Sequence, residues 1–189
     1  MRAFSGTLAR AMVGPILALG CHIRLGNAVQ EGGFEKMGNP TADAFWARYA
    51  REHNLADAHY IAASFGDSAA MADELLTLVL TGRKRATASL VRDYRRTGGH
   101  PFPKVGEYIV WLDGSGCPRC ITQTTSVEVK PLSQVHAQFA WDEGEGDRSR
   151  AWWLDAHRNY FARQAAREGF AMHDDIETVF ERFDLIWVA

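Results

Sequence analysis

The stretch TGRKRATASL, residues 81–90, combines residue types that can carry out chemistry. Lys84 lies three residues before Thr87, and a second hydroxyl, Ser89, follows. A lysine can serve as the base for a hydroxyl nucleophile when burial lowers its pKa, and neighbouring arginines would lower that pKa further by like-charge repulsion. The alternative is a cationic helix end, because positive side chains suit the negative end of the helix macrodipole.

The geometry of this stretch depends on where a strand begins. Alternate residues of a strand share a face, so Thr87 and Ser89 are expected to point together with Arg85. Lys84 converges with Thr87 only if it still lies on the turn that follows Gly82. Such a turn also exposes backbone N–H groups that help to hold anions. The stretch therefore predicts a site for an anionic or polar ligand.

A second segment, WDEGEGD at residues 141–147, offers the carboxylate that a lysine–hydroxyl pair lacks. A carboxylate can orient the lysine or relay a proton. The same oxygen atoms could hold a divalent metal ion, while a solvated acidic loop is the alternative. The sequence assigns no metal ligand and leaves a divalent cofactor open. The acidic residues are Asp142, Glu143, Glu145 and Asp147.

Charge is segregated along the chain although the formal net charge is only −2. Between Gly82 and Lys104, seven cations accompany a single anion, Asp93. This distribution predicts a basic surface with an acidic rim, although a solvated loop explains any single run. The cations are Arg83, Lys84, Arg85, Arg92, Arg95, Arg96 and Lys104.

The cysteines predict a reducing, cytoplasmic location, because Cys21, Cys117 and Cys120 are too few for a disulfide framework. Cys117 and Cys120 have redox-like spacing, but they flank a predicted hairpin turn, and no second pair completes a zinc site. No apolar run approaches the ~20 residues needed to cross a bilayer.

The N-terminal residues 1–36 carry little periodic pattern. The run AMVGPILALGC within them is a poor match to an export signal, because Pro15 interrupts it. Met37 begins a fresh segment in which Thr41 can cap a helix. We expect residues 1–36 to be a disordered or mis-called extension and residues 37–189 to form one domain.

Periodicity predicts helices and strands in mixed order, which indicates the α+β class with a small curved sheet or barrel. Trp152 and Trp153 are adjacent on a predicted helix and therefore about 100° apart, so one is expected in the core while the other could stack a base. Helices are expected at about 41–53, 68–82, 132–140 and 149–168, and strands at 85–91, 107–112, 120–129 and 179–188.

Together these segments resemble the ASCH domain family. The resemblance covers residues 65–188 and rests on the runs ELLTLVLTGRKRATAS, PKVGEYIVWLDGSG and FAWDEGEGDRSRAWWLDAHRNYF. Its motif Gly-x-Lys-x-x-[Ser/Thr] matches Gly82, Lys84 and Thr87. The family is similar in fold to PUA domains, so the resemblance implies a PUA-like small β-barrel with flanking helices and an RNA-facing cleft.

The resemblance implies a ligand class more firmly than a reaction. Some members resemble amidohydrolases that remove an acyl group from the exocyclic amine of cytidine. Carried over, their residues are Lys84 as base, Thr87 as nucleophile and Glu143 as proton-handling acid, with Glu145 as the alternative. Other members are similar to proteins that cut single-stranded RNA. We predict a hydrolase acting on RNA or a modified nucleoside, and the alternative is a non-catalytic RNA-binding module.

The expected partner is single-stranded RNA or a nucleoside, with no membrane partner and no prediction of the oligomeric state. The arginines of the basic run are expected to hold phosphates. Ser89, Glu145 and Trp153 are expected to line the ligand. The predicted substrate-binding residues are Arg83, Arg85, Ser89, Arg92, Arg95, Arg96, Glu145 and Trp153.

Overall fold

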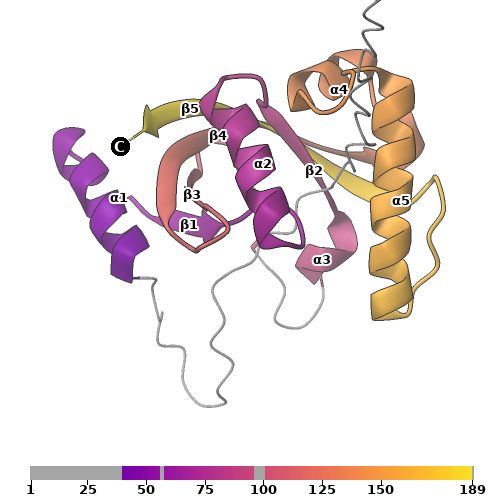
Figure 1. Cartoon of the computed structure of the whole chain (residues 1–189), viewed down its shortest axis with the longest axis horizontal. Coiled ribbons are helices and arrows are strands. Elements are labelled where there is room, and N and C mark those ends of the chain that lie inside the picture. Colours follow the sequence, from indigo (N-terminus) through magenta and orange to yellow (C-terminus); the bar gives the residue numbers. More distant parts are fainter. Residues whose placement is uncertain (1–39, 56–57, 96–100, 189) are drawn as a thin grey trace, which may run out of the picture.

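The computed structural model of the chain describes residues 40–55, 58–95 and 101–188. The expected N-terminal extension, residues 1–36, and the predicted phosphate ligand Arg96 lie outside the described residues. Helices and strands alternate irregularly along the chain (Figure 1). The elements are α1 Pro40–Glu52, β1 Tyr60–Ala63, α2 Ala69–Leu80, β2 Ala86–Leu90, α3 Val91–Arg95, β3 Tyr108–Leu112, β4 Pro118–Pro131, the 3-10 turn η1 Leu132–Gln134, α4 Ala137–Glu143, α5 Arg150–Glu168 and β5 Glu177–Val188.

The strands form one five-stranded mixed sheet in the order β1-β3-β4-β5-β2. β1 runs parallel to β3, and the other neighbouring strands are antiparallel. The sheet is open, so the expectation of a closed barrel is wrong, whereas the α+β class is confirmed. The two edge strands are short, and in Figure 1 the helix that connects them, α2, lies between them in front of the sheet. Leu75, Leu76 and Val79 of α2 are buried in the hydrophobic core.

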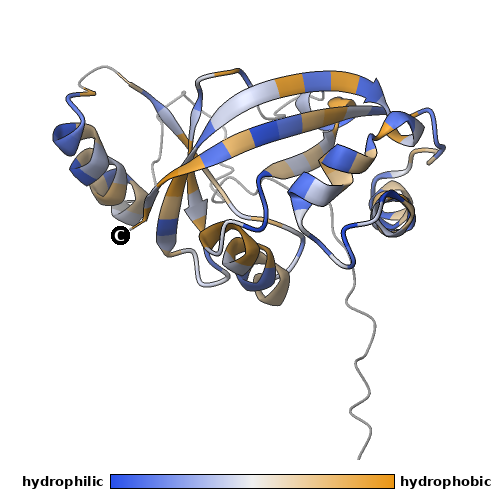
Figure 2. Ribbon diagram, turned by 90° about the horizontal axis from the view of Figure 1, so that it is seen from above, coloured by the Kyte–Doolittle hydropathy of each residue, from blue (hydrophilic) through white to orange (hydrophobic). Residues whose placement is uncertain are grey.

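Helices cover the sheet at both ends, with α1 at one end and α5 at the other (Figures 1 and 2). Trp46 and Tyr49 of α1 pack in a cluster with Val110 and Ile121 of the sheet. At the opposite end, Phe180 of β5 contacts aromatic rings from α4 and α5. The two long strands carry alternating hydrophilic and hydrophobic bands in Figure 2, as expected for strands with unlike faces. No helix within the described ranges is long and apolar enough to cross a membrane.

Most of the predicted helices and strands are present. The caps of two helices explain why the local sequence pattern was sufficient to predict them. Ser68 and Ser149 accept hydrogen bonds from backbone N–H groups at the starts of α2 and α5. β1 and α3 were not predicted, because four and five residues are too few to display a periodicity. The helix expected at 132–140 is divided into η1 and α4, and α4 continues to Glu143.

Candidate functional site

Lys84 lies on the turn between α2 and β2. α2 ends at Leu80, Gly82 adopts a φ of +70°, and β2 begins at Ala86. The backbone N–H groups of Arg83 and Lys84 both donate to the carbonyl oxygen of Leu78, at 2.8 and 2.9 Å. This tight turn directs the lysine inward, and its side chain is among the largest fully buried ones in the described structure.

Two glutamates from the end of α4 meet the buried amine. Lys84 Nζ donates to Glu143 Oε2 at 3.0 Å and to Glu145 Oε1 at 2.6 Å. Between these glutamates, Gly144 caps α4 in the left-handed region with a φ of +72°, which turns the chain so that residues two apart face one group. We call Lys84, Glu143 and Glu145 the Lys84 centre.

The basic turn and the acidic loop are joined by further hydrogen bonds. Arg83 Nε donates to the carbonyl oxygen of Gly144 at 2.6 Å, and its Nη2 donates to that of Gly146 at 2.9 Å. The backbone N–H of Arg85 donates to the Asp142 carbonyl oxygen at 2.7 Å. Arg83, which was expected to hold a phosphate, therefore uses Nε and Nη2 to hold the loop that carries the glutamates.

This close approach predicts that Gly144→Ala lowers the free energy of unfolding by about 2–5 kcal/mol, combining left-handed strain with overpacking. A Cβ at this position would lie 2.3 Å from the Arg83 carbonyl oxygen. Gly116→Ala is the matched control, because Gly116 has a φ of +81° and an added Cβ meets nothing within 4 Å. Urea unfolding of both variants separates the backbone strain, which both share, from the overpacking, which only Gly144→Ala introduces. Equal losses in the free energy of unfolding would show that the contact with Arg83 is unimportant.

Lys84 retains its proton in this environment. Burial acts to lower its pKa, but the nearby carboxylates of Glu143 and Glu145 outweigh that effect and raise the pKa above the ordinary lysine value. Thr87 Oγ1 is buried and has no hydrogen-bond partner, so Lys84 does not contact it. The expected lysine–threonine pair of base and nucleophile is therefore absent from this geometry, and Lys84 acts as a fixed cation.

One cation cannot neutralise two carboxylates, so the Lys84 centre carries a net negative charge when both glutamates are ionised. Burial raises the pKa of Glu145, against the opposing effect of Lys84. Glu145 is thus a carboxyl that ionises reluctantly beside an ammonium group. The glutamates contact the lysine, and no group of three or more His, Cys, Asp or Glu side chains in the described residues is arranged to hold a metal ion.

His157 of α5 lies next to the centre, and the sequence patterns did not single it out. Its ring stacks on Trp153 with centroids 3.7 Å apart, and its Nδ1 lies 2.9 Å from the Trp153 carbonyl oxygen. Burial lowers the pKa of His157 to about 4, so the ring is neutral. Because a carbonyl only accepts, Nδ1 carries the hydrogen and Nε2 is an acceptor. The sequence signal for this position is the four-residue spacing between Trp153 and His157, which places both rings on the same face of the helix.

Two hydrogen-bond acceptors, one on His157 and one on Glu143, lie close together beside Lys84. His157 Nε2 lies 3.8 Å from Glu143 Oε1, and neither atom has a hydrogen-bond partner. Buried acceptors normally have donors, and an unpaired one costs free energy. Each of these two buried acceptors therefore lacks a donor within the described structure.

Another buried carboxyl, that of Glu181 on β5, lies opposite Thr87 on the neighbouring strand. The two residues are direct antiparallel partners, so their side chains lie on the same face of the sheet. Glu181 Oε1 accepts a hydrogen bond from Thr124 Oγ1 at 2.6 Å, and burial raises the pKa of Glu181 to about 7. The sequence signal for this residue was a lone glutamate on a strand face shared with Val179 and Phe183.

The other predicted ligand residues are dispersed. Ser89 hydrogen-bonds to the Tyr94 hydroxyl at 2.6 Å. Arg92 pairs with Glu168 and Arg95 with Glu177, and both arginines line a separate cavity of about 530 Å³ beside the start of β5. The basic run therefore does not form one continuous phosphate surface within the described residues, because the chain turns into α3 after β2.

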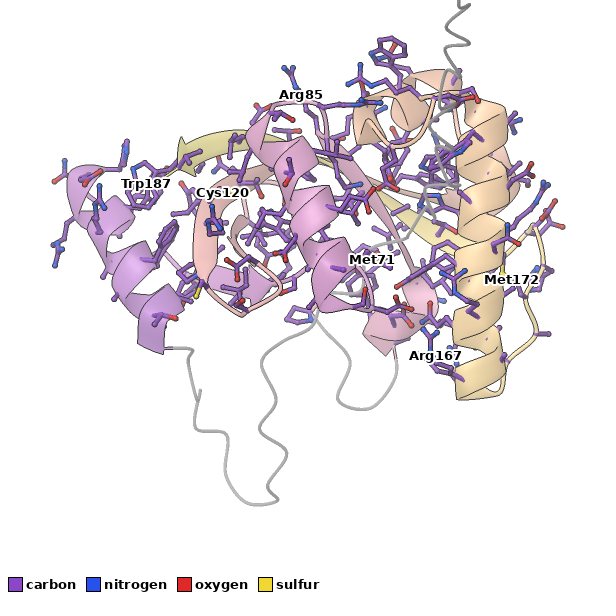
Figure 3. The ribbon with its side chains drawn as sticks, viewed as in Figure 1. Met71, Arg85, Cys120, Arg167, Met172 and Trp187 are labelled. Carbon is purple, nitrogen blue, oxygen red and sulfur yellow. The ribbon has the colours of Figure 1, made fainter. Side chains whose placement is uncertain are left out.

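Trp153 is buried, whereas Arg85 is exposed to solvent. Trp153 is 1% exposed and packs in the core, so the expectation that it stacks a ligand base is not met. Arg85 is exposed and lies at the surface near α2 and α4 (Figure 3). Its Nε donates to the Gly82 carbonyl oxygen at 3.2 Å.

The fold and the site define an α+β domain in which a glycine–lysine turn and an acidic, glycine-rich loop meet at a buried centre. The chain belongs to the ASCH domain family, whose model matches residues 61–187. ASCH domains are generally RNA-binding. No curated protein matches the sequence.

Two solved structures are similar over most of the chain. The ASCH domain from Lactobacillus crispatus JV V101 is 34% identical with a TM-score of 0.67, and the match covers 80% of this chain and 97% of that one. Protein EF3133 from Enterococcus faecalis V583, a DUF984 protein, is 30% identical with a TM-score of 0.71, over 78% of this chain and 88% of that one.

Proposed function

We propose that this protein binds RNA or a modified nucleoside at the Lys84 centre and hydrolyses an acyl group from the exocyclic amine of a base. The observation that carries this proposal is the pair of unpaired acceptors, Glu143 Oε1 and His157 Nε2, facing each other beside a fixed ammonium group. An N-acylated amine supplies an N–H donor for the acceptors and a carbonyl oxygen for the cation.

Charge supports an amide substrate over a phosphodiester. Lys84 is the one cation among two buried glutamates, and the His157 ring beside them is neutral. A phosphodiester would place a further anion beside two buried carboxyl groups that share one cation, which is unfavourable at low dielectric. A neutral amide avoids this cost.

In the proposed reaction, Thr87 attacks the acyl carbon, and its cross-strand partner Glu181 takes the hydroxyl proton. Lys84 stabilises the negative charge that develops on the carbonyl oxygen. Glu181 passes this proton to the leaving amine as the C–N bond breaks, while Glu143 orients the amine by accepting a hydrogen bond from its N–H. Glu181 then takes a proton from the attacking water and returns it to Thr87 as the acyl group leaves as a carboxylic acid, so the net reaction consumes one water.

Burial of the centre supports a second candidate, an RNA-binding module without chemistry. Lys84 is 2% and Thr87 4% exposed. In that case the Lys84 centre only joins the turn to the loop, and RNA meets the exposed arginines outside.

The experiment that tests both candidates offers purified protein N4-acetylcytidine and a labelled single-stranded RNA, with and without a chelator. We expect deacylation by the wild type and at least a hundredfold loss in Thr87→Val, because the nucleophile is removed. The control is Thr125→Val, which changes an exposed threonine of β4. RNA binding without deacylation would leave the second candidate, and neither binding nor deacylation would contradict both.

A further inference from the structure

Trp141 of α4 is an aromatic residue that the core does not use. It is 54% exposed, whereas its neighbours Phe139 and Ala140 are almost fully buried. It lies on α4, two residues before Glu143 of the Lys84 centre. A large aromatic ring exposed beside charged groups is typical of a surface that binds a partner.

Arg148 lies over the Trp141 ring, with its guanidinium carbon 4.6 Å from the ring centroid. The residue has a φ of +64°, in the left-handed region that is unfavourable for any residue with a Cβ. Its Nη2 donates to the Arg83 carbonyl oxygen at 3.2 Å, and its buried Nε has no partner. The loop thus maintains an unfavourable backbone conformation at the residue that stacks on the tryptophan.

Three arginines without salt-bridge partners in the described structure lie near this stacked pair. Arg83, Arg85 and Arg148 form no salt bridge with a carboxylate of the described chain, and the hydrogen bonds of their side chains go to carbonyl oxygens. Arg92 and Arg95, in contrast, are paired with glutamates. Three guanidinium groups without a salt bridge, near an exposed indole, complement a ligand that carries both phosphates and a planar base.

We propose that Trp141, Arg148, Arg83 and Arg85 form a platform for single-stranded RNA at the rim of the Lys84 centre, with one unpaired base on the indole and flanking phosphates on the arginines. The proposal rests on the proposed function only in taking RNA as the partner. The bases of a duplex are already stacked and cannot lie on an indole, and a free nucleoside has no phosphate for the arginines.

The test measures the affinity of a labelled 12-nucleotide oligouridine, and of the same strand in a duplex, by fluorescence anisotropy. Stacking of one base predicts that Trp141→Ala weakens single-strand binding about tenfold while duplex binding is unchanged. The matched control is Phe102→Ala, which removes an aromatic side chain that is 39% exposed elsewhere. Arg85→Ala is expected to reduce the salt slope of log K by about 0.7, which Trp141→Ala does not change.

The outcomes separate the two proposals. If the wild type binds the single strand and Trp141→Ala binds as well as Phe102→Ala, the platform is contradicted and the proposed function is untouched. Equal losses for single strand and duplex would also contradict it, because a stacked base must be unpaired. If the wild type deacylates the nucleoside but binds no RNA, the platform alone fails.

Discussion

Lys84→Met is expected to lower the free energy of unfolding by about 3–5 kcal/mol at pH 7, the range for removing one partner of a buried ion pair. The substitution preserves much of the side-chain volume but leaves Glu143 and Glu145 without their cation, and both carboxyls are almost fully buried. Urea unfolding at several pH values measures the loss. The control is Lys130→Met, whose partner Glu128 is partly exposed and whose loss should stay within about 1 kcal/mol.

The loss should depend on pH with a definite sign. Because the pKa of Lys84 is raised, its stabilising effect is fully present below the ordinary lysine value, so the wild type retains it from pH 4 to 8. In the variant, the pKa of Glu145 would rise further, and protonation at low pH would remove the cost of burying an anion. The destabilisation should therefore grow from pH 4 to pH 8. A loss independent of pH would mean that volume, and not charge, explains the effect.

Glu181→Gln is expected to make stability less dependent on pH. The pKa of Glu181 is raised from 4.5 to about 7 by burial, so the folded protein favours the protonated carboxyl. The stability that Glu181 provides through its protonated form is fully present below pH 4.5 and is lost as the pH rises through about 7. The corresponding loss in the free energy of unfolding is roughly 3 kcal/mol. Glutamine keeps the shape and can still accept from Thr124, but it does not ionise.

The measurement is the free energy of unfolding at pH 4.5, 6 and 7.5 for the wild type, Glu181→Gln and a control, Glu74→Gln, which changes an exposed glutamate of α2. The difference between Glu181→Gln and the wild type should increase in favour of the variant across this range. Parallel curves for all three proteins would show that Glu181 has an ordinary pKa in the folded state.

The parts of the site that the sequence predicted are those set by local rules. Gly82 ends the helical segment and leaves Lys84 on a turn, and the pattern of α2 and its serine cap is visible without any tertiary contact. The acidic loop was also assigned correctly as the segment that offers a carboxylate to the lysine. The alternation of glutamate and glycine in this loop favours a reversal of the chain, which can direct two glutamate side chains to one group.

Tertiary contacts determine the rest. The sequence suggested that Arg83 and Arg85 lower the pKa of Lys84, but Arg83 is directed to the loop carbonyls, Arg85 is exposed, and two carboxylates contact the amine instead. His157 and Glu181 are on distant elements, and nothing local shows that they approach Lys84 or Thr87. The open sheet depends on which strands pair with which, and strand propensity does not encode that pairing.

The hydrogen bonds of Arg85 have a consequence for attempts to transplant the site. Its N–H bonds to Asp142 at the end of α4, while its carbonyl accepts from Phe183 of β5, so three separate segments meet at the residue after Lys84. A loop graft carrying only residues 82–90 would bring the lysine and the threonine without the elements that bury them. In a peptide or a foreign scaffold that lysine would be an ordinary solvated amine, which makes the whole domain the smallest unit that can be moved.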